Sequence, residues 1–398
     1  LGLRDYRVKM PGLRGDPCIP KTLLDAGLKH PQCQDVLALT SNEEANLKIA
    51  VMARLLNPSA QVICRSTSRA HEEDLRSLGG VTVVDPFETF AKGLCTAILS
   101  PKLHTLSEWL IGARGVRLSP PLHCPMGTWI LCGYGRMGKH VHAALHDRGI
   151  PTVVIDPNIE NADAIKQKVI GFANRKNLIK VGIETAAGIV VATESDSANL
   201  KILLTIRTLN PDIFIVTRQN SHQNEVAFQA ARADLVMQPS LVTARKILLR
   251  LISPLIQSFL DHLQSDDSSL AHVYQLLEKT IADSKPYLWT VDVSKDGPCA
   301  ACYEQHSDSK LMIGDLIRHP SDRGQSLDCI PLVVLRNRTE LFMPKPSQTR
   351  ILPKDVILFC GTKGAQRLLE ATMNNPYTLH YLTTGIQEPA GVLMKWIY

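Results

Sequence analysis

The chain of 398 residues has no long apolar run, no strong excess of charge and no dense set of cysteines. Its most apolar stretch, residues 247–260, contains Arg250 and Pro254, so no membrane span is predicted within the chain as given. A net charge of +6 is too small to predict nucleic-acid binding. The ten cysteines are too widely spread for a disulfide scaffold, and no signal peptide is seen, which favours the reducing cytosol.

The remaining composition is that of a globular protein. Hydrophobic residues make up 44% and charged residues 21% of the chain, which predicts buried cores rather than disorder. A length of 398 residues predicts two or three domains.

An internal repeat organises the chain. Residues 35–86 align without gaps to residues 188–239, at an offset of 153 and with 15 identities in 52 positions. The identities include Ala-Asn-Leu-Lys-Ile at 45–49 and 198–202, Leu-Asn-Pro at 56–58 and 209–211, and the pairs Thr40/Thr193, Arg65/Arg218 and Pro86/Pro239. This offset is too long for a solenoid unit and predicts two tandem domains.

Strands and helices alternate along the second copy. The expected strands are 129–132, 153–155, 168–171, 189–192 and 213–216, with helices between them, one of them near 158–167. Ser195 or Asp196 is expected to cap a helix that stops at Asn210 and Pro211. Continuous apolar strands between helices predict a doubly wound parallel sheet that is covered on both faces.

The first copy lacks the front half of this pattern. Only 14 residues precede Gly15 and Asp16, too few for a strand, a helix and a second strand. The chain also begins with Leu1 rather than Met. We therefore expect further sequence upstream of residue 1, the alternative being a degenerate domain.

The pattern changes after Pro239. Residues 241–264 predict one long helix bent at Pro254, and a second helix follows the polar break at 265–269. Strands at 288–293, 331–335 and 356–359 and a short helix at 312–318 then predict a small α+β lobe. The expected segments are 1–125 (a partial first domain), 126–240 (the second domain), 241–285 (pairing helices), 286–372 (the lobe) and 373–398 (an unassigned tail).

A glycine-rich run lies between an expected strand and an expected helix: Gly133, Tyr134, Gly135, Arg136, Met137 and Gly138. In such a loop the first glycine permits a tight turn, the second lets the backbone approach a diphosphate, and the third lets helix and strand pack closely. The free N–H groups and the dipole at the helix start favour phosphate.

An acidic residue follows at the distance that dinucleotide binding requires. Asp156 ends the next expected strand, 18 residues after Gly138, where it would accept hydrogen bonds from a ribose diol. A carboxylate there favours NAD(H) over its 2′-phosphate form, with ADP or ATP as the next candidates. The alternative is a vestigial turn that is kept only for packing.

These features resemble the RCK domain (regulator of potassium conductance), which is also the nucleotide-binding subunit of Trk-type potassium uptake systems. The resemblance rests on the glycine loop, on Asp156, on the strand ends at Ala192-Thr193 and Arg218, and on the helix at Asn199-Leu200. Residues 351–356, before Cys360 and Gly361, resemble the small C-terminal lobe of the family. The resemblance covers 127–240, 15–86 as a half domain, and 286–365 more loosely.

The resemblance implies an α/β fold: tandem Rossmann-like doubly wound parallel sheets, the first lacking its front half, plus a small C-terminal α+β lobe. It implies that Gly133, Gly135 and Arg136 hold phosphates and that Asp156 binds ribose. It places Ala192 and Thr193 at the mouth of the crevice, and Arg218 near phosphate or the neighbouring domain.

Two departures from the family pattern point to one competent site. The family usually has Gly-Asp after the third strand, where this chain has Gly171 and Phe172. The first copy keeps Gly15-Asp16, Thr40 and Arg65 but shows no glycine loop. We therefore expect a single nucleotide site, in the second domain.

The resemblance also implies a function. It implies a cytoplasmic gating module of a potassium channel or transport system, at the inner face of the cell membrane, homo-oligomeric, with neither catalytic residues nor a metal. The paired domains would move only if the nucleotide binds their two arrangements with different affinity. The pore would be a separate subunit or an upstream segment of the same chain.

Two other functions stay open. An oxidoreductase needs the same loop together with a proton donor; no Tyr-x-x-x-Lys pair follows the second set of strands, while 13 histidines leave a histidine donor open. A regulatory module of a cation/proton antiporter would share the same sequence features.

Smaller motifs are interpreted as structural. Cys299 and Cys302, with His306 nearby, lack the second pair that a zinc site needs. His142 and His146, at i and i+4, are expected on the surface. We expect Arg65, Arg69 and Arg76 on a solvated face, the alternative being a basic patch. We expect the apolar stripe of 241–260 to face a partner or a paired domain, the alternative being a plain core helix.

Overall fold

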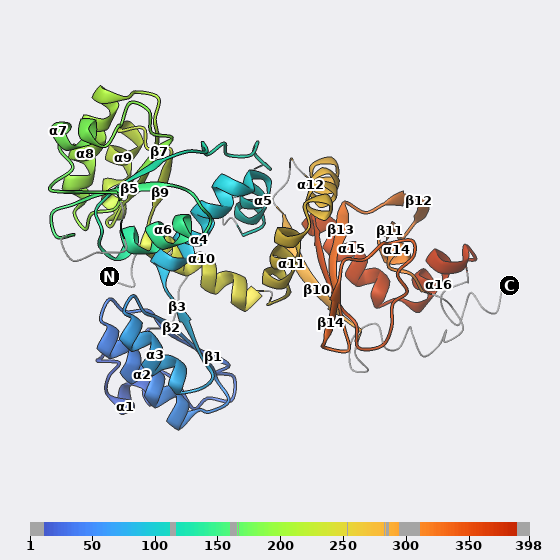
Figure 1. The fold of residues 1–398 in the computed structure, drawn as a ribbon. Coiled ribbons are helices and arrows are strands. Elements are labelled where there is room, and N and C mark those ends of the chain that lie inside the picture. The colour runs from blue at the N-terminus through green and yellow to red at the C-terminus, as the bar shows by residue number, and fades with distance from the viewer. Residues whose placement is uncertain are drawn as a thin grey trace. The chain divides into compact units, whose positions relative to one another are not determined.

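The computed structural model describes residues 12–111, 117–159, 165, 167–252, 254–281, 283, 286–293 and 311–387. The chain forms two compact units (Figure 1). One unit contains residues 1–98, which we call the first copy, and 124–247, which we call the second copy. The other contains 99–123 and 248–398. The five segment boundaries expected above stay a prediction.

The first copy is a three-stranded parallel sheet in the order β1-β2-β3. Its elements are α1 (Pro20–Asp25), β1 (Asp35–Ala38), α2 (Glu43–Leu56), β2 (Gln61–Arg65), α3 (Arg69–Ser77), β3 (Val81–Val84) and α4 (Pro86–Leu99). Apolar residues of β1 and β2 pack with Ile49, Ala50 and Ala53 of α2 and with Leu75 of α3. This face forms the core of the copy.

The second copy is a six-stranded parallel sheet in the order β6-β5-β4-β7-β8-β9. This order, which reverses direction next to β4, is that of a doubly wound sheet, so the predicted fold class is confirmed. Its elements are β4 (Trp129–Cys132), α6 (Arg136–His146), β5 (Thr152–Asp156), β6 (Lys168–Ile170), α7 (Arg175–Lys180), β7 (Gly188–Val191), α8 (Asp196–Leu209), β8 (Phe214–Arg218), η2 (His222–Asn224), α9 (Glu225–Ala230), β9 (Leu235–Met237) and α10 (Pro239–Ile252). All residues of β4 and β7 are buried, as continuous apolar strands predict.

One conserved position of the repeat joins strand ends in both copies. In the second copy the side-chain oxygen of Asn199 accepts from Thr193, and its Nδ2 donates to the carbonyl oxygens of Thr193 and Arg218. In the first copy Asn46 makes the same bonds to Thr40 and Arg65. The identities at these positions therefore preserve the hydrogen bonds of one asparagine to two strand ends, which we call the joint.

The helix predicted over 241–264 is described as α10 and α11 (Pro254–Ser265). Residue 253 between them lies outside the described residues, so the bend at Pro254 stays a prediction. Proline has no N–H group for the helix ladder and is tolerated at a helix start, which is where Pro254 lies. In the second unit, α11 and α12 (Asp267–Ile281) share an apolar core with α5 (Pro101–Ile111).

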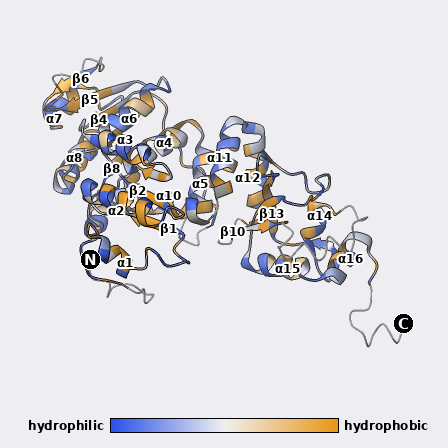
Figure 2. Ribbon diagram, turned by 90° about the horizontal axis from the view of Figure 1, so that it is seen from below, coloured by the Kyte–Doolittle hydropathy of each residue, from blue (hydrophilic) through white to orange (hydrophobic). Residues whose placement is uncertain are grey.

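The rest of the second unit confirms the predicted α+β lobe. Its antiparallel sheet has the order β10-β15-β13-β14. The elements are β10 (Tyr287–Asp292), α14 (Ile313–Leu316), β11 (Arg318–His319), β12 (Asp322–Ser326), β13 (Cys329–Arg336), β14 (Glu340–Phe342), β15 (Val356–Gly361), α15 (Lys363–Met373) and α16 (Pro376–Thr384). The turn before β15 is restrained, since Lys354 has a φ of 71° and buried Asp355 pairs with Arg336 at 2.9 Å. In Figure 2 hydrophobic ribbon follows strands such as β2 and β13.

Some expectations cannot be compared with the structure. The Cys299/Cys302 pair with His306 and most of the helix expected near 158–167 lie outside the described residues. Eight cysteines lie within them, and all eight are free thiols. Among the described helices, none combines the length and the hydrophobicity that crossing a membrane requires.

Candidate functional site

Two of the loop glycines are required by packing. Gly133 follows β4 with a φ of 101°, and a Cβ there would lie 3.2 Å from the backbone carbon of Ala192. A Cβ on Gly138 would overlap the carbonyl oxygen of Gly133. Only glycine fits either position, because the loop folds back tightly between β4, β7 and α6.

The middle glycine has a different environment. Gly135 precedes α6 as its N-cap residue and is exposed, and a Cβ there would meet no atom within 4 Å. No described side chain caps α6, whereas Asn42 and Ser195 cap α2 and α8. The N–H groups at the start of α6 therefore lack side-chain acceptors and border open space, which fits a phosphate group.

Asp156 lies beside this loop, as predicted. It ends β5, which pairs with β4, and its Oδ2 accepts the N–H of Tyr134 at 2.7 Å. Its Oδ1 accepts the N–H of Asn158 at 2.7 Å. The two bonds hold the carboxylate at the loop, and each oxygen keeps a lone pair that a ribose hydroxyl can use.

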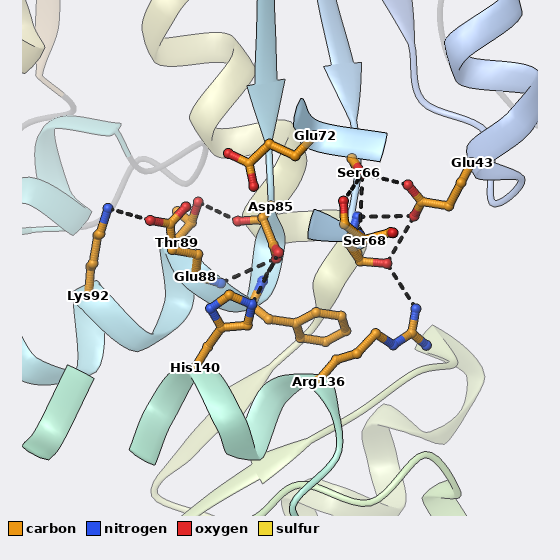
Figure 3. Close-up of polar contacts among 12 residues, drawn as sticks. Glu43, Ser66, Ser68, Glu72, Asp85, Glu88, Thr89, Lys92, Arg136 and His140 are labelled. Atoms are coloured by element: carbon orange, nitrogen blue, oxygen red, sulfur yellow. Dashed lines mark hydrogen bonds and ion pairs between the residues drawn. The ribbon is translucent and has the colours of Figure 1, made fainter. Parts of the chain in front are cut away.

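Arg136, the first residue of α6, faces the first copy. Its Nη1 donates to the hydroxyl of Thr67 at 2.9 Å, and its Nη2 pairs with Glu194 at 3.0 Å. Thr67 in turn donates to Glu43 (Figure 3). The predicted phosphate ligand is thus held between an acid of its own copy and the other copy.

Arg218, the last residue of β8, is only 6% exposed. Its Nε donates to Asn220 at 2.8 Å, while its Nη1 is buried without a hydrogen-bond partner among the described residues. Burial lowers the pKa of Arg218, and the carboxylate of Glu194 partly offsets this. A buried guanidinium nitrogen without an acceptor fits an anion.

The other predicted site residues have structural partners. Met137 is fully buried in the core, so its side chain does not border the open space. The hydroxyl of Thr193 is bonded to Asn199 at 2.5 Å. Ala192 donates its N–H to Cys132, and the Tyr134 ring lies edge-on to His142. The assignment of the ten site residues to a nucleotide stays a prediction.

Four residues near the loop were not predicted: Thr67, Asp85, Phe87 and His140. Phe87 and the carboxylate of Asp85 are buried at the start of α4, and His140 Nε2 on α6 lies 3.3 Å from Asp85 (Figure 3). The hydrogen bond to Asp85 raises the pKa of His140, although burial opposes it. Three of the four belong to the first copy, so a reading of the glycine motif alone does not find them.

Two minor expectations need correction. His142 is half-buried, with Nδ1 2.8 Å from the hydroxyl of Thr152, rather than a surface residue. Arg69 and Arg76 are exposed and pair with Glu73 and Glu72, but Arg65 is half-buried and does not share this face. No group of three or more side chains that could hold a metal ion occurs in the described part of the chain.

Residues 3–86 and 129–239 match the family model of the TrkA-N domain. Each copy contains one of the two matched ranges. The match confirms the resemblance drawn from the glycine loop and the repeat. Most of α4 and all of α5 lie between the two matched ranges. Residues 99–123 of the second unit, which include α5, therefore precede the second range, and residues 248–398 follow it.

Relatives of the chain include two named potassium transport proteins. Potassium channel protein 1 of Methanocaldococcus jannaschii is 27% identical over 164 residues, 39% of this chain and 49% of that protein. The Trk system potassium uptake protein TrkA homolog of Pyrococcus horikoshii is 24% identical over 199 residues, 47% of this chain and 86% of that protein. The GsuK channel bound to NAD is 17% identical, with a TM-score of 0.46 over 91% of this chain and 70% of that one. The chain spans 26% to 49% of the length of the first three curated relatives that it matches.

Proposed function

We propose that the chain is the nucleotide-binding regulatory module of a potassium channel or potassium transport system, acting at the cytoplasmic face of the membrane. The observation that carries this proposal is the uncapped start of α6, open beyond Gly135 and adjacent to Asp156. The two TrkA-N matches support it, as do the names of the two potassium transport relatives.

The proposed ligand is NAD(H), with ADP or ATP as the next candidates. The backbone of Gly133 to Gly138 would hold the diphosphate, and Asp156 would accept hydrogen bonds from the ribose. A 2′-phosphate would meet the charge of Asp156, which disfavours the phosphorylated dinucleotide. Arg136 and Arg218 would contribute positive charge, provided that Arg136 exchanges Glu194 for phosphate.

Titration of the full chain with NADH, NAD, ADP and ATP tests this site. Gly135→Asp places a carboxylate in the phosphate space, and like charges cost several kcal/mol, so affinity should fall roughly a hundredfold or more. Gly364→Asp is the matched control, because it puts the same side chain on the exposed first turn of α15. Equal affinity of wild type and Gly135→Asp would reject the site.

Regulation and catalysis differ in what happens to the bound nucleotide. A regulatory module changes the distribution of its conformations without consuming NADH, whereas an oxidoreductase consumes it with an acceptor. Steady turnover by the wild type that Gly135→Asp abolishes would favour the enzyme. Potassium flux with the membrane partner, measured together with proton flux in the opposite direction, separates a potassium channel or uptake system from a cation/proton antiporter.

The proposed partner is a pore or transporter subunit, either separate or encoded upstream in the same chain, within a homo-oligomer. Sequencing the gene upstream of Leu1 tests the second arrangement. An open frame with two apolar helices around a Thr-x-Gly-Tyr-Gly-like filter would identify a channel.

A further inference from the structure

A phenylalanine of the first copy lies between two arginines of the second. Phe87 is 1% exposed in the first turn of α4. Its ring centre is 5.5 Å from Cζ of Arg136 and 4.9 Å from Cζ of Arg218. Both distances are within the range of a cation–π interaction, and burial strengthens such interactions. One ring therefore fixes two guanidinium groups at once.

One N–H donor of Arg218, on Nη1, has no acceptor among the described residues. Nε of Arg218 donates to Asn220, and Cζ of Arg218 lies over the ring of Phe87. Nη1 then remains buried and unpartnered among the described residues. The carboxylates of Glu194 and Asp196 act on the pKa of Arg218 in the opposite direction to the guanidinium groups of Arg136 and Arg65, so the missing feature is an acceptor rather than charge. An anion would supply that acceptor, and because protein atoms cover Nη1, its binding requires the side chains around Arg218 to shift.

The same ring belongs to the capped start of α4. The N–H of Phe87 donates to Oδ1 of Asp85 at 2.7 Å, and Asp85 also pairs with His140 of α6. α4 ends at Leu99, where the chain enters the second unit. A movement of the two arginines would therefore act on the first turn of the helix that leads out of the copies.

We propose that Phe87 is a positioning residue of the nucleotide site: it holds Arg136 and Arg218 so that Nη1 of Arg218 meets a phosphate oxygen, and it couples phosphate binding to the start of α4. This inference rests on the proposed function, since the phosphate belongs to the nucleotide in the glycine loop. It assigns the first copy, whose described residues contain no glycine loop, a part in the site of the second.

The test compares ADP with adenosine, which lacks the phosphates, by titration of the full chain. Phe87→Leu keeps an apolar side chain and removes the ring. It should weaken ADP binding about 5- to 30-fold, the range expected for the loss of one or two buried cation–π contacts, and change adenosine binding less than about twofold. Phe87→Tyr keeps an aromatic ring and should bind ADP with the affinity of the wild type. Phe90→Leu, a buried position one turn along α4, is the matched control and should bind ADP like the wild type.

Hydrogen exchange of the wild type tests the coupling without any substitution. ADP should slow exchange in the first turn of α4, and adenosine should not. Wild-type ADP affinity in Phe87→Leu, equal weakening of ADP and adenosine, or unchanged exchange in α4 would each overturn the inference. If the wild type and Phe90→Leu bind neither ADP nor NAD, the proposed function itself fails.

Discussion

The two copies share a joint but differ in what surrounds it. Asn46 and Asn199 make equivalent bonds at the ends of neighbouring strands, and both are almost fully buried. An acid opens the following helix in both copies: Glu43 binds Thr67, whereas Asp196 binds Asn220 and Ser221. Burial alone would raise the pKa of Asp196, but its several hydrogen bonds lower it.

The surroundings differ because the second sheet has more strands. β7 pairs with both β4 and β8, whereas β1 pairs, among the described strands, only with β2. At equivalent positions, Val190 is fully buried and Leu37 is 43% exposed. Nearly the same local sequence pattern is therefore core in one copy and edge in the other. The difference teaches that the neighbouring strands, rather than the repeat, decide burial.

The largest effect is expected in the loop that only the second copy shows. Gly138→Ala would force a Cβ onto the carbonyl oxygen of Gly133, which should lower the free energy of unfolding by about 3 kcal/mol. Gly93→Ala is the control in the first copy, because its Cβ would meet nothing within 4 Å. It should stabilise α4 by about 0.5–1 kcal/mol. Urea denaturation of the two variants measures both values, and equal signs would contradict this account of the loop.

Because both copies contain the joint, replacing its asparagine should lower the free energy of unfolding by a similar amount in each copy. Asn199→Ala and Asn46→Ala each leave buried backbone groups unpaired, so each should cost about 2 kcal/mol. Leu204→Ala on α8, where the side chain is 63% exposed, should cost less than about 0.5 kcal/mol. Thermal unfolding of the three variants tests the equivalence. A loss confined to Asn199 would show that the first joint is not needed for stability.

The burial difference predicts unequal losses at equivalent strand positions. Val190→Ala removes two buried methyl groups from the second sheet and should cost about 1.5 kcal/mol. Leu37→Ala removes a half-exposed side chain and should cost about 0.5 kcal/mol or less. Urea midpoints compare the two. A larger loss at Leu37 would mean that another part of the chain or a partner covers β1 in solution.

The smallest effect is expected at the contact between Asp85 of the first copy and His140 of the second copy. The folded pKa of His140 is raised, mainly by its hydrogen bond to Asp85, and the charges of Asp85, Glu88 and Glu72 all face it. Its contribution to stability is therefore full below about pH 6.5 and is lost as the pH rises through the raised value. Solvent screening keeps the effect below about 1 kcal/mol.

Unfolding of the wild type, measured from about pH 5 to about pH 8, tests this contact. His140→Gln should flatten the part of the profile that its titration causes. His272→Gln, at an exposed histidine of α12, is the control. A wild-type profile in His140→Gln would show that the contact with Asp85 does not stabilise the fold.

Local patterns predicted most of the elements well. α8 begins at Asp196 with Ser195 as its cap, and it ends before Asn210 and Pro211, as the sequence indicates. At Pro254 a local pattern decides less, since a proline at the first position of a helix resembles a proline that bends one. The turn at Gly133 and its neighbour Asp156 were predictable because adjacent parallel strands end at the same edge.

The sequence by itself determined the repeat, the parallel α/β class and the glycine loop with its acid. These depend on the period of apolar residues and on backbone freedom, which are local properties. Only the tertiary structure decided that Phe87 and Thr67 of the first copy contact the arginines of the second, and that Nη1 of Arg218 is left without a partner. Contacts between residues so far apart in the chain, such as Thr67 and Arg136 at a separation of 69, depend on how complete sheets pack, and no local pattern encodes them.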